Sequence, residues 1–296
     1  MHNSQKASGS AMTLAVALNR AVHRLGAVSP SAQLDAEVLL AHVLNKDRAY
    51  LKAWPEFSLD DEHMGTYDQL LSARAQGTPI AYLIGTREFW SREFLVSPDV
   101  LIPRPETELL VQLTLDAVAD APGSTVLDLG TGSGAIAITI AAEYPAATVY
   151  ASDLSEAALR VARLNAERYQ TGNLHFLRSN WFADFPQGLC FDVIVSNPPY
   201  IPDSDPHLTQ GDVRFEPPVA IRAGADGFDA FRTIVAQAGR RLNTGAWILM
   251  EHGHDQADRL HELLEPRGYT MISHHADLQG HMRVTRAAWW RQSDNA

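Results

Sequence analysis

The chain has 296 residues, more than most single domains, so we expect one large domain and one smaller domain. Its apolar fraction of 46% and charged fraction of 20% are typical of a soluble globular protein, and no apolar run approaches the length of a membrane span. The polar first residues and the single cysteine predict a cytoplasmic protein. A net charge of −11 disfavours stable nucleic acid binding, because phosphate-binding surfaces need clustered Lys and Arg.

The first third of the chain has the apolar spacing of amphipathic helices. Residues 1–12 predict a flexible tail. Three apolar stripes at helical spacing follow, formed by Leu14, Leu18, Val22 and Leu25, by Leu34, Val38 and Ala41, and by Met64, Tyr67 and Leu71. Ser29 and Pro30 are expected to begin the second helix, and Asp60 is expected to cap the third. We therefore predict a small helical bundle over residues 13–85.

Beyond the bundle the apolar pattern changes. Residues 86–102 predict a hairpin-like connector, and strands alternate with helices over residues 103–296. The strand candidates are Thr125–Leu129, Ala147–Ala151, Leu174–Arg178, Phe191–Ser196, Ala246–Met250 and Tyr269–His274, with His281–Thr285 as a late edge strand. This alternation predicts an α/β fold with a doubly wound, mainly parallel sheet, which binds ligands at the carboxyl ends of its strands.

A glycine-rich loop follows the first of these strands. It consists of Gly130, Thr131, Gly132, Ser133 and Gly134, and an apolar helix comes next. Glycines permit a tight turn and the close approach of a nucleotide to the bare backbone, although a plain strand-to-helix turn also uses them. Asp153 closes the next strand, where nucleotide-binding folds hold ribose hydroxyls. The loop predicts a nucleotide-like cofactor without distinguishing NAD from S-adenosylmethionine.

The tetrapeptide Asn197-Pro198-Pro199-Tyr200 follows the strand 191–196. A planar NH2 group conjugated to a carbonyl or an aromatic ring is a poor nucleophile, so it must be held in line with the methyl of a sulfonium. The Asn197 side-chain oxygen and the Pro198 carbonyl can accept its two N–H bonds, and Tyr200 can stack on its planar face. The sequence therefore favours an S-adenosylmethionine-dependent methyltransferase. A nicotinamide oxidoreductase would leave the tetrapeptide without a role.

Together these motifs resemble the bacterial release factor glutamine methyltransferases, also called the PrmC/HemK family. Besides the glycine loop and the tetrapeptide, the resemblance includes Leu-Ile-Pro-Arg-Pro-Glu-Thr-Glu at 101–108, Phe-Glu-Pro-Pro at 215–218 and Glu-His-Gly at 251–253. It covers nearly the whole chain and implies a class I S-adenosylmethionine-dependent methyltransferase fold behind a helical N-terminal domain. The implied substrate is the glutamine in the Gly-Gly-Gln motif of class-one peptide chain release factors, with S-adenosylhomocysteine as the other product.

The resemblance also assigns site residues. Gly130 to Gly134 and Asp153 would hold the methionine and ribose parts of the cofactor. Trp181 would pack on the adenine, and Asn197 would touch both cofactor and substrate. Asn180 stands where the family often has Asp, and it can accept a bond from the adenine amino group without bringing a charge. The substrate site would be completed by Pro198, Pro199 and Tyr200.

Other features carry less weight. The histidine pairs 252/254 and 274/275 lack a recognisable ligand spacing, so we expect no metal. Glu216 is interpreted as a solvated or capping acid. The alternatives within the same chemistry are an amino-methyltransferase for DNA adenine, because such enzymes share the tetrapeptide, and an enzyme for a ribosomal protein glutamine. A noncatalytic partner-binding protein would explain only the helical region, which we expect to recognise the protein substrate.

Overall fold

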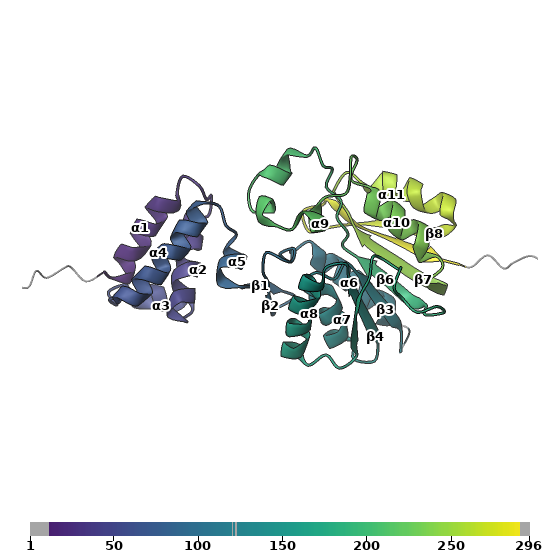
Figure 1. Cartoon of the computed structure of the whole chain (residues 1–296), viewed down its shortest axis with the longest axis horizontal. Coiled ribbons are helices and arrows are strands. Elements are labelled where there is room, and N and C mark those ends of the chain that lie inside the picture. Colours follow the sequence, from purple (N-terminus) through teal and green to yellow (C-terminus); the bar gives the residue numbers. More distant parts are fainter. Residues whose placement is uncertain (1–11, 120, 122, 291–296) are drawn as a thin grey trace, which may run out of the picture. The chain divides into compact units, whose positions relative to one another are not determined.

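The computed structural model describes residues 12–119, 121 and 123–290 (Figure 1). The chain divides into two compact units, Met1–Gly85 and Thr86–Ala296. Apart from Met12, the expected flexible tail lies outside the described residues. Among the helices that the structure describes, none is long and apolar enough to cross a membrane.

The first unit is a bundle of helices. These are α1 (Leu14–Leu25), α2 (Ala32–Leu44), α3 (Arg48–Ala53), α4 (Asp61–Ala75) and α5 (Ile80–Ile84). Its core is formed mainly by α1, α2 and α4, whose almost fully buried side chains include Leu14, Leu39, Leu40, Tyr67 and Leu71. The three predicted apolar stripes correspond to these three helices. Helices α3 and α5 are not predicted from the sequence, because such short helices show no clear periodicity.

The helix starts of this unit show how far caps can be predicted. Asp60 caps α4 as predicted, since its carboxylate accepts a first-turn backbone N–H bond of 2.8 Å. The predicted start of α2 at Ser29 and Pro30 is wrong, because the helix begins at Ala32. The Ser29 hydroxyl instead donates a 2.7 Å bond to the buried carboxylate of Asp35, one turn into the helix. This side-chain bond orders the chain before the helix starts.

The second unit is built on a seven-stranded sheet of order β5-β4-β3-β6-β7-β9-β8. Its strands are β3 (Thr125–Leu129), β4 (Thr148–Asp153), β5 (Leu174–Arg178), β6 (Phe191–Ser196), β7 (Leu242–Glu251), β8 (Tyr269–Ala276) and β9 (Met282–Trp289). The five strands from β5 to β7 pair in parallel. The predicted doubly wound, mainly parallel α/β fold is therefore confirmed, and β3, β5 and β6 have the predicted bounds.

Helices cover both faces of this sheet (Figure 1). One face packs against α6 (Thr107–Ala119), α7 (Ala135–Glu143) and α8 (Glu156–Tyr169), and the other against α10 (Asp229–Ala238) and α11 (Ala257–Leu264). Neighbouring residues of one strand face opposite layers: Val126 belongs to the first core and Leu127 to the second. Shorter helical turns are η1 (Pro206–Thr209), η2 (Val213–Phe215), α9 (Pro218–Ile221) and η3 (Glu265–Arg267).

Two antiparallel features complete the second unit. The strands β1 (Thr86–Phe89) and β2 (Arg92–Leu95) form a hairpin, and its side chains Phe89 and Phe94 are buried in the first core. The prediction of a late edge strand over 281–285 is wrong, because β9 pairs with both β7 and β8 and β8 forms the edge. After β7 the chain first forms the edge strand β8 and then returns to place β9 between β7 and β8. No local sequence pattern encodes this order.

Candidate active site

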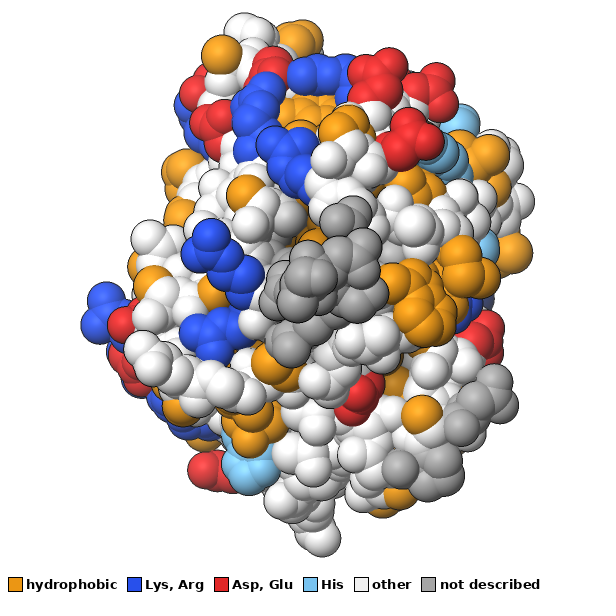
Figure 2. All heavy atoms as spheres, turned by 90° about the vertical axis from the view of Figure 1, so that its right-hand side faces the viewer, with side chains coloured by type: hydrophobic (Ala, Val, Ile, Leu, Met, Phe, Trp, Pro, Cys, Tyr) orange, Lys and Arg blue, Asp and Glu red, His pale blue; other side chains and the backbone are white. Residues whose placement is uncertain are grey.

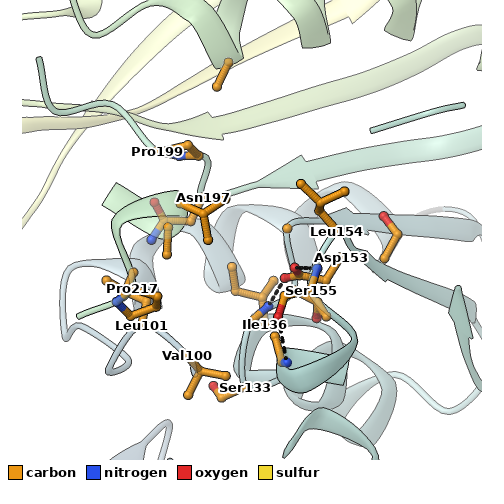
Figure 3. Close-up of a pocket in the computed structure, with 18 of the residues that line it drawn as sticks. Val100, Leu101, Ser133, Ile136, Asp153, Leu154, Ser155, Asn197, Pro199 and Pro217 are labelled. Atoms are coloured by element: carbon orange, nitrogen blue, oxygen red, sulfur yellow. Dashed lines mark hydrogen bonds between the residues drawn. The ribbon is translucent and has the colours of Figure 1, made fainter. Parts of the chain in front are cut away.

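A cavity of about 370 Å³ opens at the carboxyl ends of β3, β4 and β6 (Figure 3). This is the edge where a parallel sheet binds ligands, and the volume lies in the range of small-molecule sites. In Figure 3, Asp153 and Ser155 lie on one side of the cavity, and Asn197 and Pro199 lie on the other. The structure thus brings together in one cavity Gly130, Thr131, Gly132, Ser133, Asp153, Asn180, Trp181, Asn197 and Pro199.

The glycine loop connects β3 to α7 along the cavity wall. Gly132 has a φ of +56°, and a Cβ atom there would meet nothing within 4 Å, so the bare backbone faces open space. At Gly134, a Cβ would lie 2.7 Å from the side chain of Ile138 and 3.2 Å from Ala162. Gly134 therefore permits close packing of α7 and α8 and is not a lining residue of the cavity.

Buried polar side chains stabilise this loop from below. Asp128, which is fully buried at the end of β3, accepts a 2.7 Å bond from the Thr131 hydroxyl. Burial raises the pKa of the Asp128 carboxyl to about 7, although the bond from Thr131 opposes the rise. Asn165 donates a 2.8 Å bond to the Ser133 carbonyl. The loop conformation is thus held by side chains of the fold itself.

Asp153 lies at the end of β4 and faces the same cavity. Its Oδ2 accepts a 2.9 Å bond from the Gly132 N–H, and its Oδ1 accepts a 2.8 Å bond from the Ser155 N–H. Burial raises the pKa of the carboxyl, while these backbone bonds lower it. Each carboxylate oxygen has a second lone pair, so Asp153 can anchor the loop and still accept hydroxyl donors from a ligand.

Asn180 and Trp181 follow β5 and line the cavity next to Asp153. Trp181 has a φ of +51°, and its carbonyl accepts a 2.8 Å bond from the Ser179 hydroxyl. Its neighbour Phe182 is instead buried in the second core. Of the two adjacent aromatics, only Trp181 therefore lines the cavity and can offer its ring to a planar ligand.

A second cavity of about 320 Å³ adjoins the first. It is lined by all four residues of the tetrapeptide, together with polar side chains that include Glu251 and Arg283. Asn197 and Pro199 line both cavities, whereas Pro198 and Tyr200 line only the second. The tetrapeptide therefore forms part of the wall between the two spaces.

Two side chains of the tetrapeptide, those of Asn197 and Tyr200, form hydrogen bonds with neighbouring side chains of the second unit. Asn197 Nδ2 donates a 3.2 Å bond to Thr107 Oγ1 at the start of α6, which leaves Asn197 Oδ1 as an acceptor for another group. The Tyr200 hydroxyl donates a bond of 3.4 Å to Glu251 Oε1. Burial raises the pKa of the Tyr200 hydroxyl above its usual range, so the group remains a donor at neutral pH.

The Glu216 carboxylate is neither solvated nor bonded to a helix end, so its interpretation from sequence as a solvated or capping acid is wrong. It is buried, accepts a 3.1 Å bond from the Ile102 N–H and forms an ion pair with Arg104. Burial raises the pKa of its carboxyl, and the charge of Arg104 lowers it. The pair ties the segment before α6 to the loop after the tetrapeptide, and both residues line the second cavity.

The C-terminal histidines have local partners. His252 and His274 each form a ring-nitrogen hydrogen bond with Thr285 Oγ1, at 2.9 and 2.8 Å. Burial lowers the pKa of His252, so its neutral form is favoured. Among the described residues, no group of three or more His, Cys, Asp or Glu side chains is placed to hold a metal ion.

Sequence reasoning did not single out Arg104, Thr107, Glu216 or Glu251 as site residues. Arg104 and Glu216 are 112 positions apart, so their contact depends on the fold. A signal was nevertheless present for Glu251, because it ends an apolar strand whose carboxyl end belongs to the ligand-binding edge. The short segments at 101–108, 215–218 and 251–253 entered the sequence analysis only as motifs of the family resemblance. In the structure each of them contributes at least one residue to the second cavity.

Comparison with known proteins decides the family. The chain is 45% identical to the release factor glutamine methyltransferase of Aliivibrio fischeri over 261 residues, which are 88% of this chain and 92% of that protein. It is 48% identical to the enzyme of the same name from Pseudomonas aeruginosa, over 88% of this chain and 94% of that protein. The chain belongs to the release factor glutamine methyltransferase family.

Family models and a solved structure agree with this membership. Residues 16–85 match the PrmC N-terminal domain, and residues 120–294 match a methyltransferase domain. A methyltransferase structure from Pyrococcus furiosus aligns with a TM-score of 0.52 at 18% identity, over 75% of this chain and 99% of that chain. At this identity the structure supports the fold alone. As a member of the release factor glutamine methyltransferase family, the protein is a methyltransferase with a class I fold.

Proposed function

We propose that this protein transfers a methyl group from S-adenosylmethionine to the side-chain amide nitrogen of the glutamine in the Gly-Gly-Gln motif of class-one peptide chain release factors. The observation that carries the proposal is that Asn197 lines both cavities, one formed by the glycine loop and the other by the tetrapeptide. The substrate class is proposed from the relatives of this chain, which are named release factor glutamine methyltransferases. Translation termination takes place in the cytoplasm, which is the proposed location.

The side chains around the first cavity fit S-adenosylmethionine. When bound, this cofactor supplies an electrophilic methyl group on a sulfonium. The open space beside Gly132 accommodates a ligand against the backbone, and Asp153 retains lone pairs for ribose hydroxyls. Trp181 offers an aromatic face for the adenine, and Asn180 offers a neutral acceptor for its amino group. NAD shares the ribose and adenine parts but gives the tetrapeptide no task.

The tetrapeptide positions the acceptor amide. Asn197 Oδ1 and the Pro198 carbonyl accept the two N–H bonds of the planar NH2 group, and these bonds strengthen as positive charge develops on nitrogen. Tyr200 and the two prolines enclose the amide and exclude water. Since Asn197 is not a strong base, it acts by positioning and charge stabilisation, and the proton leaves after methyl transfer.

Surface charge favours a protein substrate over duplex DNA. The net charge is −11, and on the face shown in Figure 2 the Lys and Arg side chains occur in small separate groups, several of them beside Asp and Glu. Proteins that follow a phosphate backbone present clustered basic side chains instead. Every described residue that lines the two cavities belongs to the second unit, so we assign recognition of the protein substrate to residues 13–85.

A methyl-transfer assay tests this proposal. The protein is incubated with S-adenosylmethionine labelled in the methyl group and, in separate reactions, with a purified class-one release factor, duplex DNA containing unmethylated adenine, and a ribosomal protein mixture. We expect label in the release factor and none above background in the other two reactions. Label in DNA or ribosomal protein, with an unlabelled release factor, would contradict the proposal.

A further inference from the structure

Gln256 carries a buried amide beside the tetrapeptide that the proposed chemistry leaves unused. It lies immediately before α11 and is 7% exposed. Its Nε2 donates a 3.0 Å bond to the carbonyl of Tyr200, the last residue of the tetrapeptide, and a longer bond of 3.5 Å to the Gly227 carbonyl. Its Oε1 accepts a 2.8 Å bond from the Gly253 N–H. The orientation of this amide is therefore set, because a flipped amide would place its oxygen against two carbonyl oxygens.

Gly227 brings a third segment, the loop before α10, close to the same Tyr200 carbonyl. Gly227 has a φ of +76°, and a Cβ atom there would lie 2.5 Å from the Tyr200 oxygen and 3.0 Å from Gln256 Nε2. Even a methyl side chain at this position would displace the Tyr200 carbonyl from Gln256. The end of the tetrapeptide, the loop before α10 and the segment before α11 thus meet at one oxygen atom.

The tetrapeptide is stiff between its two ends. At the first end, the preceding residue belongs to β6, which is paired on both sides within the sheet. Pro198 and Pro199 fix their own φ angles, and a residue that precedes a proline is restricted to extended backbone. The first freely rotating joint is therefore between Pro199 and Tyr200. The carbonyl that Gln256 holds lies directly after this joint.

We propose that Gln256 is a positioning residue of this active site, which holds the Tyr200 carbonyl and thereby fixes the direction of the Pro198 carbonyl and the placement of the Tyr200 ring. This inference rests on the function proposed above, because it needs these two groups to contact the acceptor amide. Gln256 lines neither cavity and does not touch the reacting atoms. It therefore affects the turnover number more than the binding of the cofactor.

The first test is Gln256→Leu, which removes the donor, in the full-length protein. It should lower kcat by about tenfold to a hundredfold, with S-adenosylhomocysteine affinity within about threefold of wild type. Asn173→Leu is the matched control. Asn173 Nδ2 likewise donates to two main-chain carbonyls, those of Ala141 and Ala147 at 3.2 and 3.0 Å, but it precedes β5 at the opposite end of the sheet. Asn173→Leu should lower the melting temperature and leave kcat within about twofold of wild type.

The second test perturbs the Tyr200 carbonyl from the other side. Gly227→Ala places a methyl group against this oxygen and should also lower kcat. Gly188→Ala is its control, because Gly188 has a φ of +79° and a Cβ there would meet nothing within 4 Å. The two substitutions share the backbone strain and differ in the contact. Gly188→Ala should therefore keep the wild-type kcat.

Gln256→Glu adds a pH-dependent readout. Burial against carbonyl oxygens raises the pKa of the introduced carboxyl above its ordinary range. The protonated carboxyl donates to the Tyr200 carbonyl as the amide does, whereas the ionised carboxylate repels it. The ratio of Gln256→Glu to wild-type kcat should therefore fall as the pH rises from about 5.5 to about 8.5. The other titratable side chains on the converging segments are the same in both enzymes and cancel in this ratio; they are Tyr200, Asp226, His252, His254, Asp255 and Arg259.

Hydrogen exchange gives a readout that needs no acceptor. The N–H of the peptide unit that follows Tyr200 belongs to Ile201, and it donates a 3.0 Å bond to the Ile221 carbonyl. Without Gln256 this peptide unit is held from one side only. The Ile201 amide should therefore exchange faster with deuterium in Gln256→Leu than in wild type, and Asn173→Leu should leave its exchange unchanged.

Several outcomes would overturn the proposal. These are a folded Gln256→Leu enzyme with wild-type kcat, an equal loss of kcat in Asn173→Leu, a loss confined to cofactor affinity, or a Gln256→Glu ratio that does not change with pH. If Gln256→Leu does not fold, Gln256→Glu and the comparison of Gly227→Ala with Gly188→Ala decide. Wild-type turnover on a release factor tests the function proposed above, whereas the ratio of variant to wild-type turnover, on whichever acceptor is methylated, tests positioning. Unchanged exchange of the Ile201 amide in Gln256→Leu would contradict positioning even without an acceptor.

Discussion

Asp153 offers a quantitative test of the first cavity as the cofactor site, because its carboxylate both anchors the glycine loop and is proposed to bind the ribose. Its two oxygens accept the N–H bonds of Gly132 and Ser155, and the second lone pairs remain for ribose hydroxyls. Asp153→Ala removes both functions at once. Asp153→Asn keeps the shape and one acceptor but turns an NH2 group toward a backbone N–H.

The magnitude follows from these bonds. Loss of two charge-assisted bonds to ribose hydroxyls in Asp153→Ala should cost about 2 to 4 kcal/mol of binding free energy. At about 1.4 kcal/mol per tenfold change, the Kd for S-adenosylhomocysteine rises about 30-fold to about 700-fold. The Gly132 and Ser155 N–H groups also lose their acceptor, so the free energy of unfolding of the ligand-free protein falls by about 1 to 3 kcal/mol. Asp153→Asn should lie between wild type and Asp153→Ala in both quantities.

Calorimetry with S-adenosylhomocysteine measures the binding change, and chemical denaturation measures the stability change. Glu156→Ala is the matched control, since that partly exposed carboxylate on α8 pairs with Arg163 and does not line the cavity. Its Kd should remain within about twofold of wild type. Unchanged affinity in folded Asp153→Ala would refute the assignment of Asp153 to the ribose. Wild-type binding of NAD as tight as that of S-adenosylhomocysteine would refute the choice of cofactor.

Two further predictions concern the tetrapeptide and the helical unit. Asn197→Ala should lower kcat by about a hundredfold or more in a steady-state methylation assay. Asn197→Asp keeps an acceptor oxygen and should retain more activity. Equal activity of wild type and Asn197→Ala would contradict the role of Asn197 in positioning the acceptor amide. A truncated chain that begins at Thr86 should bind S-adenosylhomocysteine as the full chain does but methylate intact release factor poorly. Full activity of the truncated chain would contradict the assignment of substrate recognition to residues 13–85. The truncation starts before the hairpin because Phe89 and Phe94 belong to the core of the second unit.

Much of this fold could be predicted because its signals are local. The bounds of β3, β5 and β6 follow from short stretches rich in apolar residues that are followed by polar or glycine residues. The Asp60 cap is likewise encoded by one side chain and the turn that follows it. By contrast, the position of β9 between β7 and β8 depends on sheet order. Ser29 resembles a cap in sequence but bonds to Asp35 in the fold.

The same distinction applies to the site. The glycine loop, Asp153 and the tetrapeptide were recognisable because their chemistry resides in contiguous residues or at a strand end, and the cavity brings them together. Glu216 was misinterpreted because nothing near it in sequence indicates the partner Arg104. The relation of Thr107 and Glu251 to Asn197 and Tyr200 is also nonlocal. Residues that bind a ligand could thus be named from the sequence, whereas those that hold them in place required the structure.

The central claim is that this site methylates a glutamine amide, and peptide mass spectrometry tests it most directly. A purified class-one release factor is incubated with the protein and S-adenosylmethionine, digested and fragmented to locate any added methyl group. The account predicts one methyl group on the side-chain nitrogen of the Gly-Gly-Gln glutamine, which is absent from a release factor with that glutamine replaced and strongly reduced with Asn197→Ala enzyme. A methyl group on any other residue, or an unmodified release factor beside methylated adenine in duplex DNA, would contradict it.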